Sequence, residues 1–101
     1  MGWFVYVLEC RGGVLYTGIA VDVDARYAKH VAGRGARFTR ANPPHRIVAA
    51  FACRDRSQAT RAEMALKRLD ATRKRALCAQ VPRDGLWDFL ALDEPPRQRA
   101  R

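Results

Sequence analysis

Two short apolar runs separated by a pair of glycines restrict the fold of this chain more than any other feature. Residues 3–9 and 14–20 are rich in β-branched and aromatic side chains, a composition typical of β-strands. Gly12 and Gly13 lie between the runs, and a glycine pair favours the tight turn of a β-hairpin. The sequence therefore predicts a hairpin that places Tyr6 and Tyr16 on one small sheet.

The segment that follows has the pattern of an α-helix. Asp22 or Asp24 can cap its first turn, and the helix is expected to run to about Ala32. Gly33 can end it, because glycine readily adopts the left-handed conformation found just beyond helices. The apolar stripe expected to be buried consists of Val23, Tyr27 and Val31.

The second half of the chain predicts a loop, a strand and two helices. Residues 33–46 form a basic loop, and residues 47–53 form the third strand. Ser57 can cap a helix whose core-facing residues are Ala59, Ala62, Leu66 and Leu69. Asp70 or Thr72 can cap a further helical segment. We therefore expect an α/β (α+β) fold, with a small three-stranded, mainly antiparallel sheet flanked by helices.

Composition limits the number of domains and the class of partner. The 101 residues allow one modest core, so we expect one domain over residues 1–90 and a basic, flexible tail over 91–101. The apolar segment 86–90 is expected to dock on the domain. With 19 Lys and Arg against 10 Asp and Glu, the net charge is +9 and the pI is about 10.5. Such an excess favours polyanions, nucleic acid first and anionic membranes second.

Cysteine spacing and hydropathy indicate the compartment. Cys10, Cys53 and Cys78 are widely spaced and include no C-x-x-C pair, which favours free thiols over zinc ligation or disulfides. No apolar run approaches the ~18 residues of a membrane span, and no secretory signal pattern is present. We therefore expect a protein of the reducing cytoplasm with no membrane partner.

Five residues suited to phosphodiester cleavage occur in order along the predicted elements: Tyr6, Tyr16, Arg26, His30 and Glu63. Arg26 and His30 are four residues apart, so they share one face of a helix. Glu63 lies at the flank of the second helix's apolar stripe, where it is either buried for a purpose or paired with Lys67 one turn later. Each of the others also has a structural interpretation: a tyrosine packed in the core, a surface ion pair, or a histidine on a helix face.

These residues resemble the motif of the GIY-YIG nuclease superfamily, and most closely its small stand-alone bacterial members. The resemblance covers roughly residues 3–77. It is carried by Phe4-Val5-Tyr6, by Tyr16-Thr17-Gly18, by Arg26, His30 and Glu63 in register, and by Gly33-Arg34-Gly35-Ala36. The first tripeptide lacks the family's glycine. The basic stretch Arg73-Lys74-Arg75-Ala76 stands where nuclease domains of the family often carry an asparagine.

The resemblance implies a divalent-metal-dependent DNA endonuclease. It assigns Glu63 as the sole protein ligand of one Mg²⁺ or Mn²⁺ ion, a role that suits a cation that keeps several waters. Tyr16, helped by His30, would activate water. A free phenol has a pKa of about 10, so a neighbouring cation such as Arg26 is needed to favour the phenolate. Arg26 would also stabilise transition-state charge, and Tyr6 would position the water or the phosphate. Gly18 either leaves room for a phosphate or marks a bulge.

The arginines of the expected loop are candidates for contacts with DNA phosphates: Arg34, Arg37, Arg40 and Arg46. Such contacts give affinity without sequence information. The chain shows no recognition helix with base-reading residues, so we expect cutting of branched, damaged or single-stranded DNA in repair or recombination. The alternatives are a non-catalytic nucleic-acid-binding module on the same fold and a repair-complex adaptor that uses residues 86–90.

Overall fold

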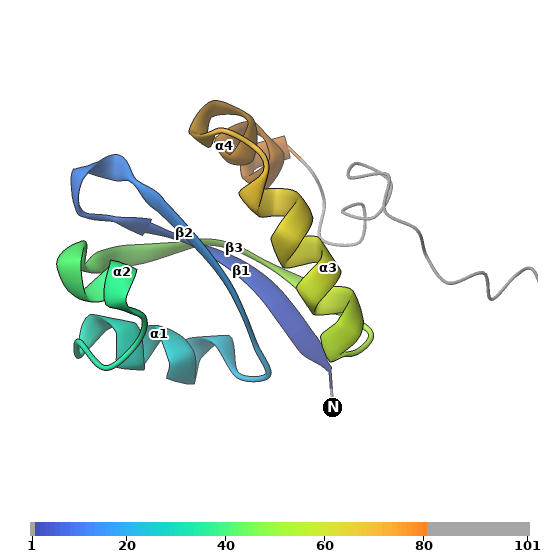
Figure 1. Cartoon of the computed structure of the whole chain (residues 1–101), viewed down its shortest axis with the longest axis horizontal. Helices are drawn as coiled ribbons and strands as arrows, with labels where there is room; N and C mark the ends of the chain where they lie inside the picture. Colours follow the sequence, from blue (N-terminus) through green and yellow to red (C-terminus); the bar gives the residue numbers. More distant parts are fainter. Residues whose placement is uncertain (1, 81–101) are drawn as a thin grey trace, which may run out of the picture.

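The three strands form one antiparallel sheet in the order β2-β1-β3 (Figure 1). The computed structural model describes residues 2–80. In it β1 spans Trp3–Cys10, β2 spans Leu15–Ala20 and β3 spans Pro44–Cys53. The expected three-stranded antiparallel sheet is therefore confirmed, and β1, which carries Tyr6, is its central strand.

The predicted hairpin joins β1 to β2 through the short 3-10 turn η1 (Arg11–Gly13). Gly12 and Gly13 have φ angles of 79° and 80°, in the left-handed region that favours glycine. The register opposes Tyr6 to Gly18 and Leu8 to Tyr16. Residues directly opposite each other point to the same face of a sheet, so both tyrosines lie on one face.

Within the described residues four α-helices cover the two faces of the sheet (Figure 1). The helices α1 (Val23–Val31) and α2 (Arg37–Ala41) lie on the face of Tyr6, and α3 (Arg56–Lys67) and α4 (Ala71–Gln80) lie on the other. Val5 and Val7 of β1 pack against Ala62 and Leu66 of α3. Tyr6 and Leu8, which alternate with them, form the second cluster with side chains of α1.

Aspartates cap three of the helices. Asp22 accepts a hydrogen bond from the Ala25 amide at 3.0 Å, and Asp70 accepts one from the Arg73 amide at 2.8 Å, as two of the alternatives predicted. The prediction of Ser57 as a cap is wrong. Asp55 caps α3 instead, accepting from the Gln58 amide at 2.8 Å, which places Ser57 inside the first turn.

Two further expectations need correction. The segment 33–46 is not all loop, because it contains α2 and because β3 already begins at Pro44. The early start of β3 pairs Arg46 with Glu9 across the strands. In α1 the expected apolar stripe is wrong at its end: Val31 is 54% exposed, and the buried residue of this helix is His30.

The remaining structural expectations concern the cysteines, the membrane and the chain end. Cys10, Cys53 and Cys78 form no disulfide. Within residues 2–80 no helix has the length and apolar character needed to cross a bilayer. The expected docking segment 86–90 and the tail 91–101 lie outside the described residues.

Candidate active site

A chain of buried hydrogen bonds joins β1, α1 and α2 beneath the surface. The Tyr6 hydroxyl lies 3.0 Å from Nε2 of His30, and Nδ1 of His30 lies 2.7 Å from the hydroxyl of Thr39. Thr39 in turn donates to the carbonyl of Ala36 at 3.0 Å. Tyr6, His30 and Thr39 are each at most 2% exposed. Residues that are far apart in sequence are therefore fixed relative to one another.

The hydrogen-bond partners determine the direction of this chain. Because the single Thr39 hydroxyl proton is donated to Ala36, its oxygen must accept from His30. We therefore infer that His30 carries its proton on Nδ1, which leaves Nε2 free to accept from the Tyr6 hydroxyl.

The electrostatics of the site agree with that direction. Burial raises the pKa of Tyr6 to about 12, and the neighbouring Tyr16 acts in the same sense against the charge of Arg26. Burial, followed by the charge of Arg26, lowers the pKa of His30. At neutral pH Tyr6 is thus a neutral phenol that can donate, and His30 is a neutral imidazole that can accept.

Two glycines provide the space that this pair needs. A Cβ atom at Gly18 would lie 2.6 Å from the Tyr6 hydroxyl oxygen, so only glycine lets the phenol lie against β2. A Cβ atom at Gly35 would overlap the imidazole ring of His30. Gly18 therefore makes room for Tyr6, rather than for a phosphate or a bulge as the sequence suggested.

Tyr16 and Arg26 lie on the solvent side of these buried groups. They line a cavity of about 360 Å³ together with Lys29, His30, Arg34, Gly35 and Ala36. The Tyr16 ring is half-buried, with its centroid 5.1 Å from that of His30 and 6.4 Å from that of Tyr6. Nη1 of Arg26 lies 3.5 Å from the carbonyl of Ile19, and Arg26 forms no ion pair within residues 2–80. Four of the five predicted residues, Tyr6, Tyr16, Arg26 and His30, therefore come together here.

Glu63 lies in the other layer and is not among the residues that line this cavity. It lies on α3, its side chain is 21% exposed, and it pairs with Nζ of Lys67 at 3.3 Å. Its negative charge is the smallest of the contributions to the raised pKa of Tyr6, of which burial is the largest. Within residues 2–80 no three His, Cys, Asp or Glu side chains cluster to hold a metal. In this part of the chain the protein therefore supplies no cage of three such ligands.

The four predicted phosphate-binding arginines separate into two groups. Arg34 lines the cavity, and Arg37 and Arg40 are exposed on α2. Arg46 lies on β3, and its Nε is 2.8 Å from Glu9, which also binds Arg75 at 2.8 Å. These cations hold the pKa of Glu9 below its usual range. Arg46 is therefore part of an ion-pair cluster away from the cavity.

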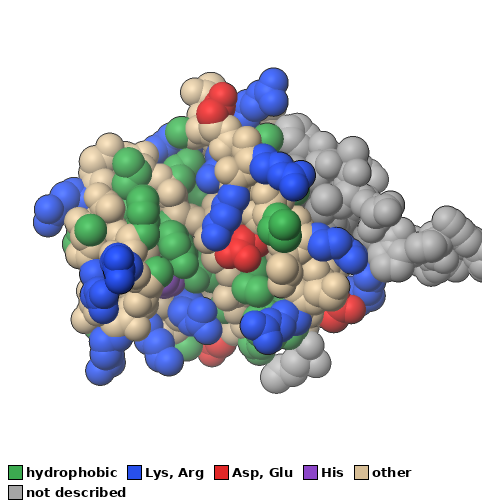
Figure 2. Space-filling model, viewed as in Figure 1, with side chains coloured by type: hydrophobic (Ala, Val, Ile, Leu, Met, Phe, Trp, Pro, Cys, Tyr) green, Lys and Arg blue, Asp and Glu red, His purple; other side chains and the backbone are tan. Residues whose placement is uncertain are grey.

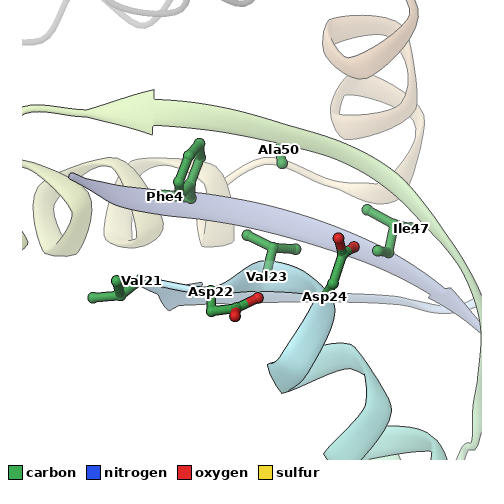
Figure 3. A pocket seen from close by; sticks show the side chains of 7 residues that line it. All are labelled: Phe4, Val21, Asp22, Val23, Asp24, Ile47 and Ala50. Carbon is green, nitrogen blue, oxygen red and sulfur yellow. The ribbon is translucent and has the colours of Figure 1, made fainter. Parts of the chain in front are cut away.

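A larger cavity of about 570 Å³ lies at the N-terminal end of α1 (Figure 3). Its walls are mainly apolar, and its charged residues are Asp22 and Asp24. Carboxylates repel phosphates, and none of the five candidate residues lines it. The smaller, basic cavity is the better candidate for an active site.

The sequence prediction missed several residues at the site, namely Lys29, Gly35, Phe38 and Thr39. Gly35 belongs to the quoted Gly33-Arg34-Gly35-Ala36 stretch, and its small size was the available sign of a close approach. Thr39 had no comparable sign, because its role depends on α2 folding over α1.

The fold agrees with the comparisons to known proteins. The model of the GIY-YIG catalytic domain matches residues 2–76, and the chain belongs to the GIY-YIG family. Within that family it is similar to small bacterial UPF0213 proteins. It is 46% identical to one from Cupriavidus necator over 79% of this chain and 87% of that protein. It is 48% identical to one from Xanthomonas axonopodis pv. citri over 80% of this chain and 79% of that protein.

A solved structure supports the fold directly. The solution NMR structure of a UPF0213 protein from Bacillus halodurans matches with a TM-score of 0.50 and 42% identity. The match covers 78% of this chain and 84% of that one. The protein therefore has the nuclease-like fold of its family.

Proposed function

We propose that the protein is a divalent-metal-dependent endonuclease that hydrolyses phosphodiester bonds in DNA. It selects DNA by structure rather than by sequence, and it acts in repair or recombination. The observation that carries this proposal is the buried Tyr6–His30–Thr39 chain, which lies directly behind a basic cavity lined by Tyr16 and Arg26. Such a buried polar network beside a cation-lined cavity is typical of catalytic sites.

Tyr16 is the residue proposed to activate water. Among the three tyrosines it is the one that lines the cavity, whereas the Tyr6 hydroxyl is buried and engaged by His30. Arg26 lines the same cavity. His30 lies against the ring of Tyr16 and fixes that side of the cavity.

Arg26 has the second role of stabilising charge on the phosphate. Because it has no carboxylate partner within residues 2–80, its guanidinium is available for charge-assisted hydrogen bonds to phosphate oxygens. Tyr6 is too deeply buried to touch a substrate, so its proposed role is to hold His30 in place.

Glu63 is the residue proposed to hold Mg²⁺ or Mn²⁺. A single carboxylate fits a hard cation that takes its other ligands from water and phosphate. A cation bound there would neutralise charge on the leaving oxygen. The ion pair between Lys67 and this carboxylate would have to break when the cation binds.

DNA is proposed to contact the basic surface around the cavity. Lys29 and Arg34 line the cavity, and Arg37 and Arg40 are exposed on α2. On the part of the visible face occupied by α1 and α2, Lys and Arg side chains outnumber acidic ones and stand among hydrophobic surface (Figure 2). Contacts of this kind bind the backbone of any sequence.

One observation favours a second candidate, a non-catalytic nucleic-acid-binding module. The Glu63–Lys67 ion pair is the common structural arrangement of a Glu and a Lys four residues apart on a helix, and it needs no metal. The stretch Arg73-Lys74-Arg75-Ala76 also lacks the asparagine often found in nuclease domains of this kind.

Incubation of the purified protein with supercoiled, branched and single-stranded DNA distinguishes the two functions. Each DNA is tested with Mg²⁺, with Mn²⁺ and with EDTA. The enzyme is expected to cut in the presence of metal and to be silent in EDTA. Tight binding with no cleavage under any metal would favour the binding module.

A further inference from the structure

Phe38, on α2, is an aromatic residue that the mechanism above does not use. Its ring stacks on that of Tyr16, with centroids 5.8 Å apart and an angle of 25° between the planes. Phe38 is nevertheless 40% exposed. Tyr16 thus lies between the imidazole of His30 and an aromatic ring that is open to solvent.

The position of Phe38 is fixed by the buried residue that follows it in the sequence, Thr39. Thr39 is fully buried and bonded to both His30 and Ala36. These bonds hold α2 against the site, although the helix has only five residues and its N-cap residue, Ala36, makes no side-chain capping bond. The ring of Phe38 is therefore held against Tyr16 before any ligand binds, and little order has to be gained on binding.

The charged side chains near Phe38 in the sequence are basic. From residue 25 to residue 45 the chain has no Asp or Glu and five Lys or Arg residues: Arg26, Lys29, Arg34, Arg37 and Arg40. Within residues 2–80 Lys29 and Arg34, which line the cavity, and Arg37 and Arg40, which are exposed on α2, form no ion pair. An exposed aromatic ring in a basic groove is the combination with which proteins bind single-stranded nucleic acid.

We propose that Phe38 is a stacking platform for an unpaired nucleobase next to the phosphate that enters the cavity. The proposal rests on the proposed function, and it specifies the substrate as DNA with an unpaired strand at the cleavage site. In an intact duplex each base face is covered by its neighbours, so the ring can select unpaired over paired DNA without reading the sequence.

Binding measurements in EDTA test the platform separately from catalysis. The probes are short oligonucleotides that carry 2-aminopurine, a base whose fluorescence is quenched by aromatic stacking. Each is measured as a single strand and as a duplex at the same salt concentration. Phe38→Leu keeps an apolar cover on Tyr16 but removes the ring, and Phe38→Trp keeps a ring. We expect Phe38→Leu to weaken single-strand binding about tenfold and duplex binding by less than about twofold. Phe38→Trp should bind single strands as tightly as the original protein and keep the quenching.

The outcomes separate the two proposals. Equal weakening of single-strand and duplex binding in Phe38→Leu, or no weakening in either, would overturn the platform. So would a Phe38→Trp protein that keeps its thermal unfolding transition but binds single strands as weakly as Phe38→Leu. If Phe38→Leu loses the quenching and the original protein cuts no DNA under any metal, the nuclease is overturned and the platform remains supported. A matching RNA single strand shows whether the platform accepts ribose as well as deoxyribose.

Discussion

The face of the sheet that packs against α3 and α4 buries aliphatic and aromatic side chains, whereas the face that packs against α1 and α2 buries a hydrogen-bonded phenol, imidazole and hydroxyl. On the first face Val5, Val7 and Leu66 are fully buried. On the second, Tyr6, His30 and Thr39 are buried to the same degree. Burying polar groups is costly unless they are paired, so the second face is held in one arrangement by its bonds. The first face contributes stability, and the second fixes the geometry of a site.

A large effect on stability alone is expected on the α3 face. Leu66→Ala should lower the free energy of unfolding by about 2–5 kcal/mol, because it removes buried methyl groups and leaves a cavity. Urea titration followed by circular dichroism measures this change. The fraction that remains folded should keep its cleavage rate per molecule. A folded Leu66→Ala protein with a strongly reduced rate would break the distinction between the two faces.

The opposite pattern is expected at Arg26. Arg26→Ala should reduce the cleavage rate by about 10²–10³-fold, because charge on the phosphate is no longer stabilised. Its unfolding transition should change little, since the side chain is exposed. Single-turnover cleavage at saturating Mg²⁺ measures the rate, and Arg73→Ala, at an exposed position on α4, is the control. Equal rates in the two variants would remove Arg26 from the mechanism.

Tyr6→Phe tests the buried hydrogen bond by titration. The pKa of Tyr6 is raised to about 12 in the folded protein, above the ordinary value of 10.0, so the unfolded chain releases this proton first. Stability should therefore fall as the pH rises through that interval, and this part of the fall should disappear in Tyr6→Phe. Ultraviolet absorbance should show one late-ionising tyrosine, absent from the variant. If all three tyrosines ionise together, the Tyr6–His30 bond is not formed as described.

Two threonines on opposite faces provide the matched comparison. Thr39→Val removes the acceptor of the His30 Nδ1–H group and should cost about 1–3 kcal/mol, because a buried donor is left unpaired. Thr17 packs on the α3 side, and its buried hydroxyl has no hydrogen-bond partner within residues 2–80. Thr17→Val should therefore be neutral or slightly stabilising.

The tautomer of the His30 imidazole shows whether Thr39 positions this ring or only packs beside it. In the original protein ¹⁵N NMR shifts should show the proton on Nδ1, and Thr39→Val should mix the two tautomers. Thr39→Ser, which keeps the hydroxyl, should restore the shifts. Unchanged shifts in Thr39→Val would mean that Thr39 does not position His30.

The hairpin and two of the helix caps could be predicted from sequence because their causes are local. Gly12 and Gly13 determine the turn, and Asp22 and Asp70 cap the helices they precede. The position of Tyr6 and Tyr16 on one face of the sheet followed from the alternation of residues along strands.

The parts that could not be predicted depend on packing between distant segments. The helix α2 has no side-chain cap at its start, so the loop prediction for residues 33–46 had no local sign against it. Thr39 therefore remained unrecognised. The burial of His30 in place of Val31 has a similar cause, because the inward face of α1 is fixed by hydrogen bonds to Tyr6 and Thr39 rather than by an apolar stripe.

The most direct test of the proposed active site is cleavage of single-stranded and branched DNA by Glu63→Gln, with Lys67→Gln as the control. Glu63→Gln keeps the size of the side chain but loses the charge that holds a hard divalent cation. Lys67→Gln breaks the same ion pair from the other side and leaves the carboxylate in place. We predict that Glu63→Gln binds DNA but does not cut it at saturating Mg²⁺, whereas Lys67→Gln cuts normally. Full activity in a folded Glu63→Gln protein would contradict the account, because Glu63 would then be only the partner of Lys67.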